Sequence, residues 1–471
     1  GFEGHFTSDC WAIRDFHEHH HVTADAKESA AMALKAGCDV NCGNTYLHLM
    51  AAYEKGLITE EEITVAAERL MTSRFLLGLF DGSEYDSIPY EKVECKEHVE
   101  LAIDVARKST VLLKNDGILP LDKKNLKTIG VVGPNADSRV ALIGNYHGTS
   151  SRYITALEGI QDEVGDDVRV MYSEGCHLYK DRCEALAWRQ DRISEAVTVA
   201  EHSDVTVVVV GLDESLEGEE MDTGNHVGSG DKADLSLPKV QQELIEAVAE
   251  TGKPFIVVLM AGSAMDLNFA QEHANAVLLP WYPGARGGKA VADILFGKCS
   301  PSGKLPITFY KDLEGMPEFT DYTMKGRTYR FMEGEALYPF GYGLSYADID
   351  VKSVSFATAP KTDEDITLKV IVANASDIAA EEVVQVYVKD LESANAVKNT
   401  SLCCFKRIAM QPKEEKEITL TVSAKALEAV DEKGDRYRDS NRFTLYVGCS
   451  QPDGRSTALT GKKPVELQVE L

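Results

Sequence analysis

The sequence lacks any uninterrupted apolar run long enough to cross a bilayer, although 44% of its 471 residues are hydrophobic. A membrane-spanning helix needs about 20 consecutive apolar residues. Positive charge is also scarce, because 49 lysines and arginines stand against 76 aspartates and glutamates, for a formal net charge of −27. Such a charge repels phosphate backbones and anionic lipid surfaces but does not repel a neutral ligand. We therefore expect no nucleic-acid partner and no membrane partner.

The ten cysteines show no regular disulfide framework. Neither Cys38 and Cys42 nor the adjacent Cys403 and Cys404 form a CxxC pair, which favours reduced thiols and a cytoplasmic protein. A secreted or periplasmic location stays open, because residue 1 is Gly rather than Met and no signal peptide stands before the first strand-like segment. We expect that a preceding segment is missing.

Two β/α units are predicted over residues 1–82. Phe2 to Thr7 is strand-like, and the helix that follows has Asp25 as its N-cap and Gly37 as its end. The stretch GCDVNCG predicts a brief buried strand, and YLHLMAAYEKG and TEEEITVAAERLMTSRFLLGLF predict helices. Two such units cannot close a core alone, since parallel strands need neighbours and cover on both faces. They are typical of the last part of a larger (β/α)8-type barrel.

The rest of the chain changes pattern twice after a linker over 83–110. Over 111–346, the apolar runs TIGVVGPN, DVTVVVVGLD, PFIVVLMAG and NAVLLPWYPG alternate with amphipathic stretches, which predicts an open parallel α/β domain. Over 347–471, ITLKVIVANAS, EEVVQVYVKD, KEITLTVSA and NRFTLYVGCS have the period-two pattern of an all-β sandwich. The sequence therefore predicts three domains of different class.

The segment His17 to His21 matches the H-E-x-x-H pattern of zinc proteases. That pattern binds zinc because a helix places two histidines four residues apart on one face. Here the cluster lies between a strand end and the N-cap Asp25, so we expect a polar βα loop and no metal site. The alternative is that one of these histidines contacts a substrate.

Two acidic features are candidates for chemistry. Asp9 stands at the carboxyl end of the first predicted strand, which faces the catalytic mouth in a parallel barrel. It could equally cap a turn beside Ser8. The loop GLDESLEGEEMDTGNHVGSGDK crowds carboxylates together after a predicted strand, and like-charge repulsion favours a protonated carboxyl that can act as a general acid. A solvated acidic loop is the plain alternative.

Taken together, several stretches resemble glycoside hydrolase family 3, the β-glucosidase and β-xylosidase group. They are GFEGHFTSD, AGCDVNCG, ARKSTVLLKNDGILPL, IGVVGPNAD, PWYPGARGGKAVADILFGKCSPSGKLPITF and YPFGYGLSY. The resemblance covers almost the whole chain in order. It implies the end of a barrel, the family's α/β sandwich domain and a fibronectin type III-like domain, and it implies no cofactor.

The resemblance also implies roles for individual residues. Asp9 corresponds to the nucleophile and Glu217 to the acid/base, with Glu219 and Glu220 as neighbours that could be confused with it. These two carboxylates would give a retaining, exo-acting β-glycosidase that works through a covalent glycosyl-enzyme. Further candidates for substrate contact are Trp11, Met221, Asp222, Tyr146 and Arg327, and His147 lies in the same loop as Tyr146. Each of them could instead be ordinary core or surface.

The sugar preference is open. A β-glucosidase is expected from the long DTGNHVGSGDK loop, whereas Cys10 directly after the nucleophile resembles the β-xylosidase branch. The family's usual sugar-holding residues lie upstream of this sequence, so activity should need a complementary N-terminal barrel segment. A homo-oligomer is possible, and a non-catalytic carbohydrate-binding fragment or scaffold is the alternative from a different class.

Overall fold

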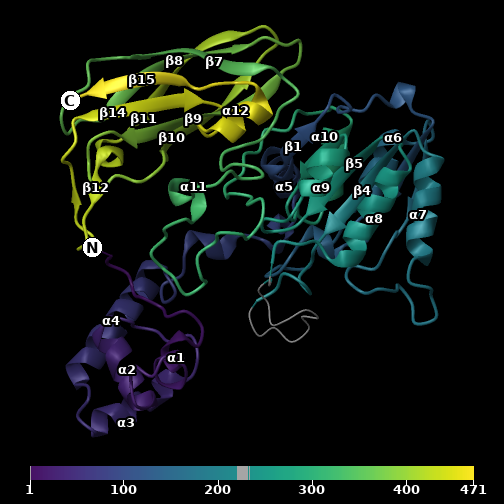
Figure 1. The fold of residues 1–471 in the computed structure, drawn as a ribbon. Coiled ribbons are helices and arrows are strands. Elements are labelled where there is room, and N and C mark those ends of the chain that lie inside the picture. Colours follow the sequence, from purple (N-terminus) through teal and green to yellow (C-terminus); the bar gives the residue numbers. More distant parts are fainter. Residues whose placement is uncertain (1, 220–231, 233) are drawn as a thin grey trace. The chain divides into compact units, whose positions relative to one another are not determined.

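A computed structural model of the chain describes residues 2–219, 232 and 234–471. The chain divides into two compact units, residues 1–93 and 94–471, which are described separately below (Figure 1). Among the helices described, none combines the length and the apolar character that a membrane span requires.

The first unit is helical. It consists of α1 (Ala12–Glu18), α2 (Ala26–Lys35), α3 (Leu49–Glu54) and α4 (Glu60–Leu76). The sequence predicted the starts of two of these helices correctly. The Asp25 carboxylate accepts the backbone N–H groups of Lys27 and Glu28, and Thr59 forms a capping box with Glu62.

The two strands predicted for this unit do not form a sheet. In their place the described residues hold one parallel bridge, between Thr7 and Val40. A parallel pair gains its stability from further strands and from helices on both faces, and this unit supplies only a small core around Leu34, Ala52 and Ile58. The expected barrel is therefore not confirmed by the structure.

The second unit begins with α5 (Lys96–Ser109) and continues into a six-stranded sheet of order β1-β6-β5-β4-β2-β3. The strands are β1 (Val111–Asn115), β2 (Thr128–Val132), β3 (Arg169–Ser173), β4 (Val205–Gly211), β5 (Phe255–Met260) and β6 (Ala276–Leu279). The prediction of a purely parallel sheet is wrong at one edge, because β1 pairs with β6 in the antiparallel sense. An antiparallel edge strand on an otherwise parallel sheet is common in α/β folds.

Helices cover both faces of this sheet, as Figure 1 shows. The central strand β4 makes the two-sided burial plain, because Val208 and Val210 belong to one core cluster and Val207 and Val209 to the other. Successive residues of a strand point to opposite faces, so a strand buried on both sides is a continuous apolar run. The helices are α6 (Ala156–Val164), α7 (Asp191–Glu201), α8 (Lys239–Glu250), α9 (Asn268–His273) and α10 (Gly287–Leu295).

The C-terminal part is the expected β-sandwich. Its sheets have the orders β10-β9-β14-β15 and β11-β8-β7, and a small ladder joins β12 to β13. The strands are β7 (Ile349–Phe356), β8 (Ile366–Asn374), β9 (Ala380–Asp390), β10 (Ser401–Met410), β11 (Glu415–Val422), β12 (Ala429–Val430), β13 (Arg436–Tyr437), β14 (Arg442–Gly448) and β15 (Val465–Glu470). Two short helices accompany them, α11 (Thr328–Phe331) and α12 (Gly454–Thr460).

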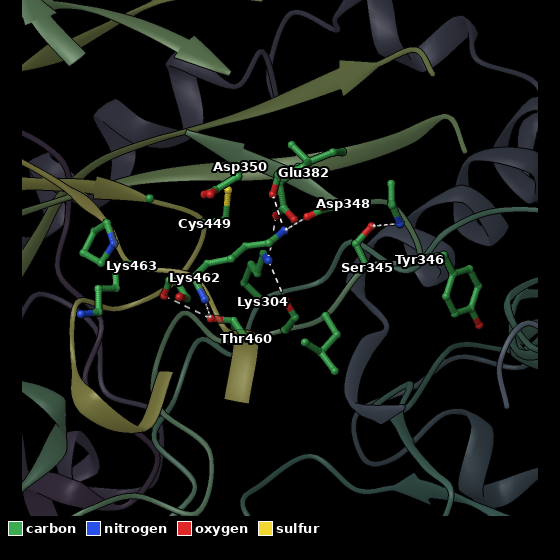
Figure 2. Close-up of a pocket in the computed structure, with 17 residues that line it drawn as sticks. Lys304, Ser345, Tyr346, Asp348, Asp350, Glu382, Cys449, Thr460, Lys462 and Lys463 are labelled. Carbon is green, nitrogen blue, oxygen red and sulfur yellow. Dashed lines mark hydrogen bonds and ion pairs between the residues drawn. The ribbon is translucent and has the colours of Figure 1, made fainter. Parts of the chain in front are cut away.

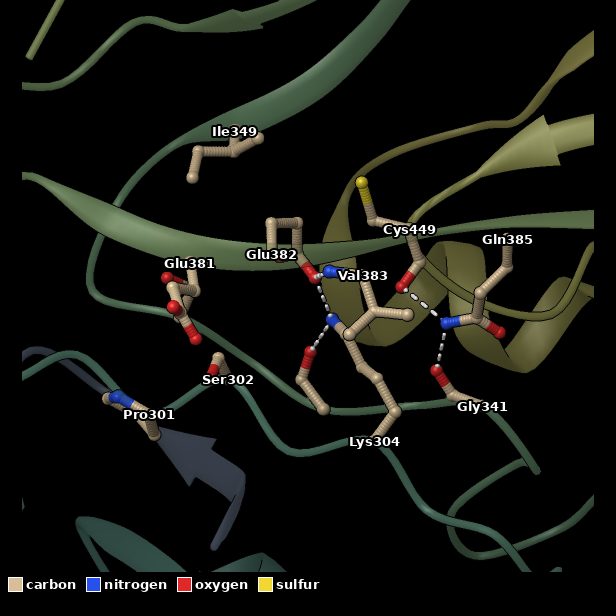
Figure 3. A network of polar contacts seen from close by, with 12 residues as sticks. Pro301, Ser302, Lys304, Gly341, Ile349, Glu381, Glu382, Val383, Gln385 and Cys449 are labelled. Atoms are coloured by element: carbon tan, nitrogen blue, oxygen red, sulfur yellow. Dashed lines mark hydrogen bonds and ion pairs between the residues drawn. The ribbon is translucent and has the colours of Figure 1, made fainter. Parts of the chain in front are cut away.

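Buried polar contacts join the sandwich to the α/β part within the second unit. Lys304 Nζ lies 2.7 Å from Glu382 Oε1 and also donates to the carbonyl oxygen of Gly343 (Figure 3). Gln385 Nε2 donates to the carbonyl oxygens of Gly341 and Cys449. A buried charge is tolerated only when it is paired and hydrogen-bonded, so Lys304 depends on this partner.

Candidate active site

Asp9 lies in an exposed loop that is tied to the segment around Cys42. The backbone N–H of Ser8 donates to the carbonyl oxygen of Val40 at 2.8 Å, and Ser8 Oγ accepts the N–H of Cys42 at 3.0 Å. A disulfide joins Cys10 to Cys42. The Asp9 carboxylate accepts the N–H of Cys10 at 2.8 Å. The backbone on both sides of Asp9 is thus held in place while its side chain stays accessible.

The sequence predicted that the thiols are reduced, and the Cys10–Cys42 disulfide shows that this prediction is wrong for two of the ten cysteines. The two cysteines are 32 residues apart in sequence, and no spacing rule links them. Their pairing follows from the fold, because the Thr7–Val40 bridge brings the ends of both segments together. The other eight cysteines are free thiols.

Trp11 is partly exposed and adopts a left-handed backbone conformation, with φ 65°, at the N-cap of α1. Its backbone N–H donates to the carbonyl oxygen of Cys42 at 2.8 Å. The guanidinium carbon of Arg14 lies 4.8 Å from the centre of its ring. The ring is therefore not a core residue, and its contact with a sugar face stays a prediction.

The histidine cluster is partly helical, which corrects the prediction of a loop. His17 and Glu18 form the last turn of α1, and His21 lies beyond its end with φ 52°. His17 Nδ1 contacts Ser29 Oγ at 2.9 Å, and His21 Nδ1 contacts the His17 carbonyl oxygen. Within the residues that the structure describes, no group of three potential ligands is placed to hold a metal ion.

Glu217 lies in the loop after β4 and connects the carboxyl ends of three adjacent parallel strands. Its Oε2 accepts the backbone N–H of Gly262, just after β5, at 2.7 Å. The same oxygen accepts the hydroxyl of Tyr282, just after β6, at 2.6 Å. Ligands of open α/β sheets bind at the carboxyl ends of the strands, so this carboxylate stands at the expected edge.

Two neighbours of Glu217 have shifted pKa values. Burial raises the pKa of Tyr282, and the nearby Glu217 carboxylate adds to the effect. Burial lowers the pKa of Lys232, against the opposing influence of Glu217 and Asp234. Lys232 Nζ donates to the carbonyl oxygen of Ala264 at 2.7 Å. Tyr282 thus stays a neutral hydrogen-bond donor at the site.

The loop that contains Tyr146 also reaches the acidic loop. His147 Nε2 lies 3.0 Å from Glu214 Oε2, while its Nδ1 lies 3.0 Å from the carbonyl oxygen of Gly148. Both ring nitrogens therefore face acceptors, which favours the doubly protonated ring. These contacts, with Gly148 first and Glu214 second, raise the pKa of His147. Tyr146 is exposed, with φ 57°.

Among the remaining candidates, Arg327 makes its contacts in another loop. Arg327 Nη2 donates to the carbonyl oxygens of Pro317 and Glu318, so it holds its own loop. Glu219 has an exposed side chain two residues beyond Glu217. Glu220, Met221 and Asp222 lie outside the described residues. Sequence reasoning missed Gly262 and Tyr282, for which the only signal was their position just after predicted strands.

Comparison with known proteins gives the class of this chain. The model of the glycosyl hydrolase family 3 C-terminal domain matches residues 110–346, and that of the fibronectin type III-like domain matches residues 382–451. The chain is a member of glycoside hydrolase family 3, as the resemblance predicted.

Relatives and solved structures agree with this membership. A β-xylosidase of Formosa agariphila is 32% identical over 98% of this chain and 65% of its own length. A periplasmic β-glucosidase of Salmonella typhimurium is 31% identical over 95% of this chain and 62% of its own. The structure of a β-glucosidase from Erythrobacter marinus has a TM-score of 0.84 at 30% identity, covering 100% of this chain and 64% of that one. The chain thus spans less than two thirds of each of these relatives.

Proposed function

We propose that this chain is the larger part of a retaining, exo-acting β-glycosidase that releases a terminal non-reducing sugar. The observation that carries the proposal is the match of nearly the whole chain to both β-xylosidases and β-glucosidases, with Asp9 in an accessible and tethered loop. Asp9 would attack the anomeric carbon while a glutamate protonates the departing oxygen. The same glutamate would then deprotonate the water that releases the covalent sugar. This chemistry requires no metal or other cofactor.

The acid/base belongs to the loop after β4, which offers two described candidates. Glu217, the candidate from resemblance, accepts two hydrogen bonds at Oε2, so it would deliver a proton from Oε1. Glu219 is the alternative. It is favoured because the two contacts of Glu217 are those expected of a residue that anchors the loop. Retention requires the acid to stand roughly 5–5.5 Å from the nucleophile carboxyl.

The sugar is β-linked glucose or β-linked xylose. Glucose is the expectation from the long acidic loop. Xylose is favoured by Cys10 directly after Asp9, bonded to Cys42, and by the Formosa agariphila relative named as a β-xylosidase. Rates on aryl β-glucoside and aryl β-xyloside, measured side by side, separate the two.

A complementary N-terminal barrel segment is the partner that we propose. The first unit exposes many large apolar side chains, although its own core is small. Contiguous exposed apolar surface marks an interaction site in a soluble protein. The large apolar residues of this unit that are more than half exposed are Phe2, Phe6, Val22, Leu47, Met50, Phe75, Leu76, Leu77, Leu79, Phe80, Tyr85, Ile88, Tyr90 and Val93.

The Cys10–Cys42 disulfide leads us to propose an oxidising compartment in place of the cytoplasm. Disulfides persist in secreted and periplasmic proteins and are rare in cytosolic ones. Fractionation of producing cells would test this, and a wholly cytoplasmic, reduced protein would contradict it.

The test of catalysis combines the chain with its upstream barrel segment. We expect Asp9→Ala to abolish hydrolysis of aryl β-glycosides and external azide to restore turnover with inverted product. Asp15→Ala is the matched control, because Asp15 lies on α1 in the same unit and contacts only His19 among the side chains recorded for it. Full activity of Asp9→Ala would remove Asp9 from the mechanism. If the unsubstituted chain and its barrel segment together bind sugar without hydrolysing it, the alternative of a non-catalytic carbohydrate-binding scaffold would hold.

The two acid candidates are separated by leaving group. The true acid, changed to Gln, should retain activity only on aryl glycosides that leave without protonation. We expect Glu217→Gln and Glu219→Gln to differ in this respect. One variant should lose hydrolysis selectively for substrates with poor leaving groups. The other should lower the rates on substrates with poor and with good leaving groups in the same proportion.

A further inference from the structure

We propose that the adjacent cysteines Cys403 and Cys404 of β10 are a reversible thiol–disulfide site, at which a small disulfide oxidises the two thiols to a disulfide ring. Both residues are free thiols, and both are partly exposed. Neither takes part in the glycoside chemistry proposed above. The redox site is therefore independent of that function and can be tested separately from it.

A break in the β10 ladder brings the two thiols to one face of the strand. Successive residues of a strand point to opposite faces. Counted back from Ile408 and Met410, which lie in the sandwich core, Cys404 belongs to the core face and Cys403 to the opposite face. The register with β9 shifts between Leu402 and Cys404, as at a β-bulge, and a bulge re-aims side chains. Both cysteines accordingly pack against the same core.

The surroundings of the two thiols decide which one reacts first. Cys403 Sγ donates to the carbonyl oxygen of Val386, on β9, at 3.2 Å. Burial raises the pKa of Cys403 to about 12, and the neighbouring Cys404 adds to the effect. Burial also raises the pKa of Cys404, against the opposing influence of the Thr421 backbone and of Lys406. Because the thiolate is the nucleophile, Cys404 should react first, and the exchange should be slow at neutral pH.

The reaction consists of two successive thiol–disulfide exchanges. The Cys404 thiolate attacks one sulfur of the small disulfide, which forms a mixed disulfide and releases the first small thiol. The Cys403 thiolate then attacks Cys404 Sγ, which closes the ring and releases the second small thiol. The two protons lost by the cysteines end on the released thiols, and the cysteines supply the two electrons that reduce the small disulfide.

The ring should open more easily than an ordinary disulfide. Consecutive Cα atoms lie about 3.8 Å apart across a trans peptide. Disulfides usually join Cα atoms about 4.4–6.8 Å apart, and departures from this geometry make the bond more reducible. Because β10 is the edge strand of its sheet, a backbone change at the bulge disturbs a ladder on one side only. Ring closure is thus reversible.

A cavity beside Cys403 gives room for the oxidant. Its volume of about 550 Å³ lies within the usual range of small-molecule sites, about 300–1,000 Å³. Its charged lining residues are three cations and two carboxylates, namely Arg330, Lys425, Arg436, Asp390 and Glu428. In a chain with a net charge of −27, this small positive surplus is local. It favours an anionic disulfide, such as oxidised glutathione, as the chemical class of the oxidant.

Cys449 provides the contrast of a thiol without an adjacent thiol. It borders a cavity of about 260 Å³ that Lys304 and Lys462 also line (Figure 2). Among the described residues that line this cavity, Cys449 is the single cysteine. Burial raises its pKa, as it does for the β10 pair. An oxidant can therefore form a mixed disulfide at Cys449 but no ring.

The test is peptide mapping of the 471-residue chain after incubation of the folded protein with oxidised glutathione. The remaining thiols are alkylated in urea before digestion with trypsin, which cuts after Lys398 and Lys406 and leaves both cysteines on the peptide 399–406. Before oxidation this peptide should carry two alkyl groups. After oxidation it should carry none and be lighter by two hydrogens. Dithiothreitol should restore both alkylation sites at a lower concentration than the one that opens Cys10–Cys42.

Single variants separate the two exchanges. Cys403→Ser should retain glutathione on Cys404 as a stable mixed disulfide, because the thiol that closes the ring is gone. Cys449→Ser is the matched control, and it should leave the mass change of the peptide 399–406 as in the parent chain.

The parent chain alone keeps the test decisive if Cys403→Ser does not fold. Two alkyl groups on the peptide 399–406 at every ratio of oxidised to reduced glutathione would overturn the proposal. Glutathione on both cysteines in place of the ring, or a ring that opens only together with Cys10–Cys42, would overturn it as well.

Discussion

A single oxygen of Glu217 joins three loops of the α/β part. Because Gly262 donates from its backbone, only proline there would remove that bond, whereas Tyr282→Phe deletes the Tyr282 hydroxyl alone. The two donors fix the direction of the carboxyl group, and with it the start of the acidic loop. Misplacement of a catalytic group by about 1 Å can cost 100-fold in rate.

Tyr282→Phe should lower the rate of glycoside hydrolysis by roughly 10- to 100-fold, since a hydrogen bond to a charged group contributes about 1.5–3 kcal/mol. The rate is measured with the barrel segment supplied, on a substrate with a poor leaving group. Tyr346→Phe is the control, because Tyr346 also donates its hydroxyl from a buried position, to the carbonyl oxygen of Ile294. Equal rates in the two variants would show that the Tyr282 contact has no part in catalysis.

His147 should titrate above its ordinary pKa of about 6.5, because its ring faces Gly148 and Glu214. A raised folded-state pKa means that the contact stabilises the fold below pH 6.5 and that this contribution is lost as pH rises through the folded-state pKa. Titration of the ring protons by NMR measures it. In Glu214→Gln the midpoint should fall towards 6.5, and an unchanged midpoint would leave Gly148 as the whole cause.

Among the secondary-structure elements, burial decided which ones could be predicted. The strands β2, β4, β5 and β6 were found from the sequence because continuous apolar runs are typical of strands covered on both faces. The edge strand β3 was missed, since only Ser173 of its five residues is buried and no continuous buried apolar run marks it. The reversed direction of β1 depends on the chain path outside the strand, so no local pattern reports it.

In the candidate site, too, some features could be predicted from the sequence and others could not. Asp9 was predicted as the nucleophile from the resemblance, and its position after the Thr7–Val40 bridge agrees with a strand end. Its disulfide could not be found, because Cys10 and Cys42 become neighbours only through that bridge. The Tyr282 contact was missed for the same reason, since a bond across 65 residues leaves no trace in spacing.

Replacing Cys10 and Cys42 by serine should destabilise the first unit by about 3.7 kcal/mol, on the chain-entropy scale for a loop of 32 residues. The stability is measured by chemical denaturation of the intact chain, following a signal from Trp11. Cys95→Ser is the control, because Cys95 is a free thiol outside this loop. If stability is retained but hydrolysis falls, the disulfide acts by holding the Asp9 loop.

In the second unit as a whole, stability depends on two apolar sheet faces, a sandwich core and the polar junction between them. The Lys304–Glu382 pair is the most buried ion pair of that junction, with side chains 10% and 5% exposed. Removing one partner leaves an unpaired buried charge, which costs about 3–5 kcal/mol, whereas replacing both by apolar residues is often nearly neutral. We therefore expect Lys304→Met and Glu382→Leu each to lower the free energy of unfolding by that amount. The double variant should recover most of the loss, as urea denaturation of all three proteins would show. Additive losses would mean that each side chain acts through its backbone contacts, such as that of Lys304 with Gly343, and not through the pair.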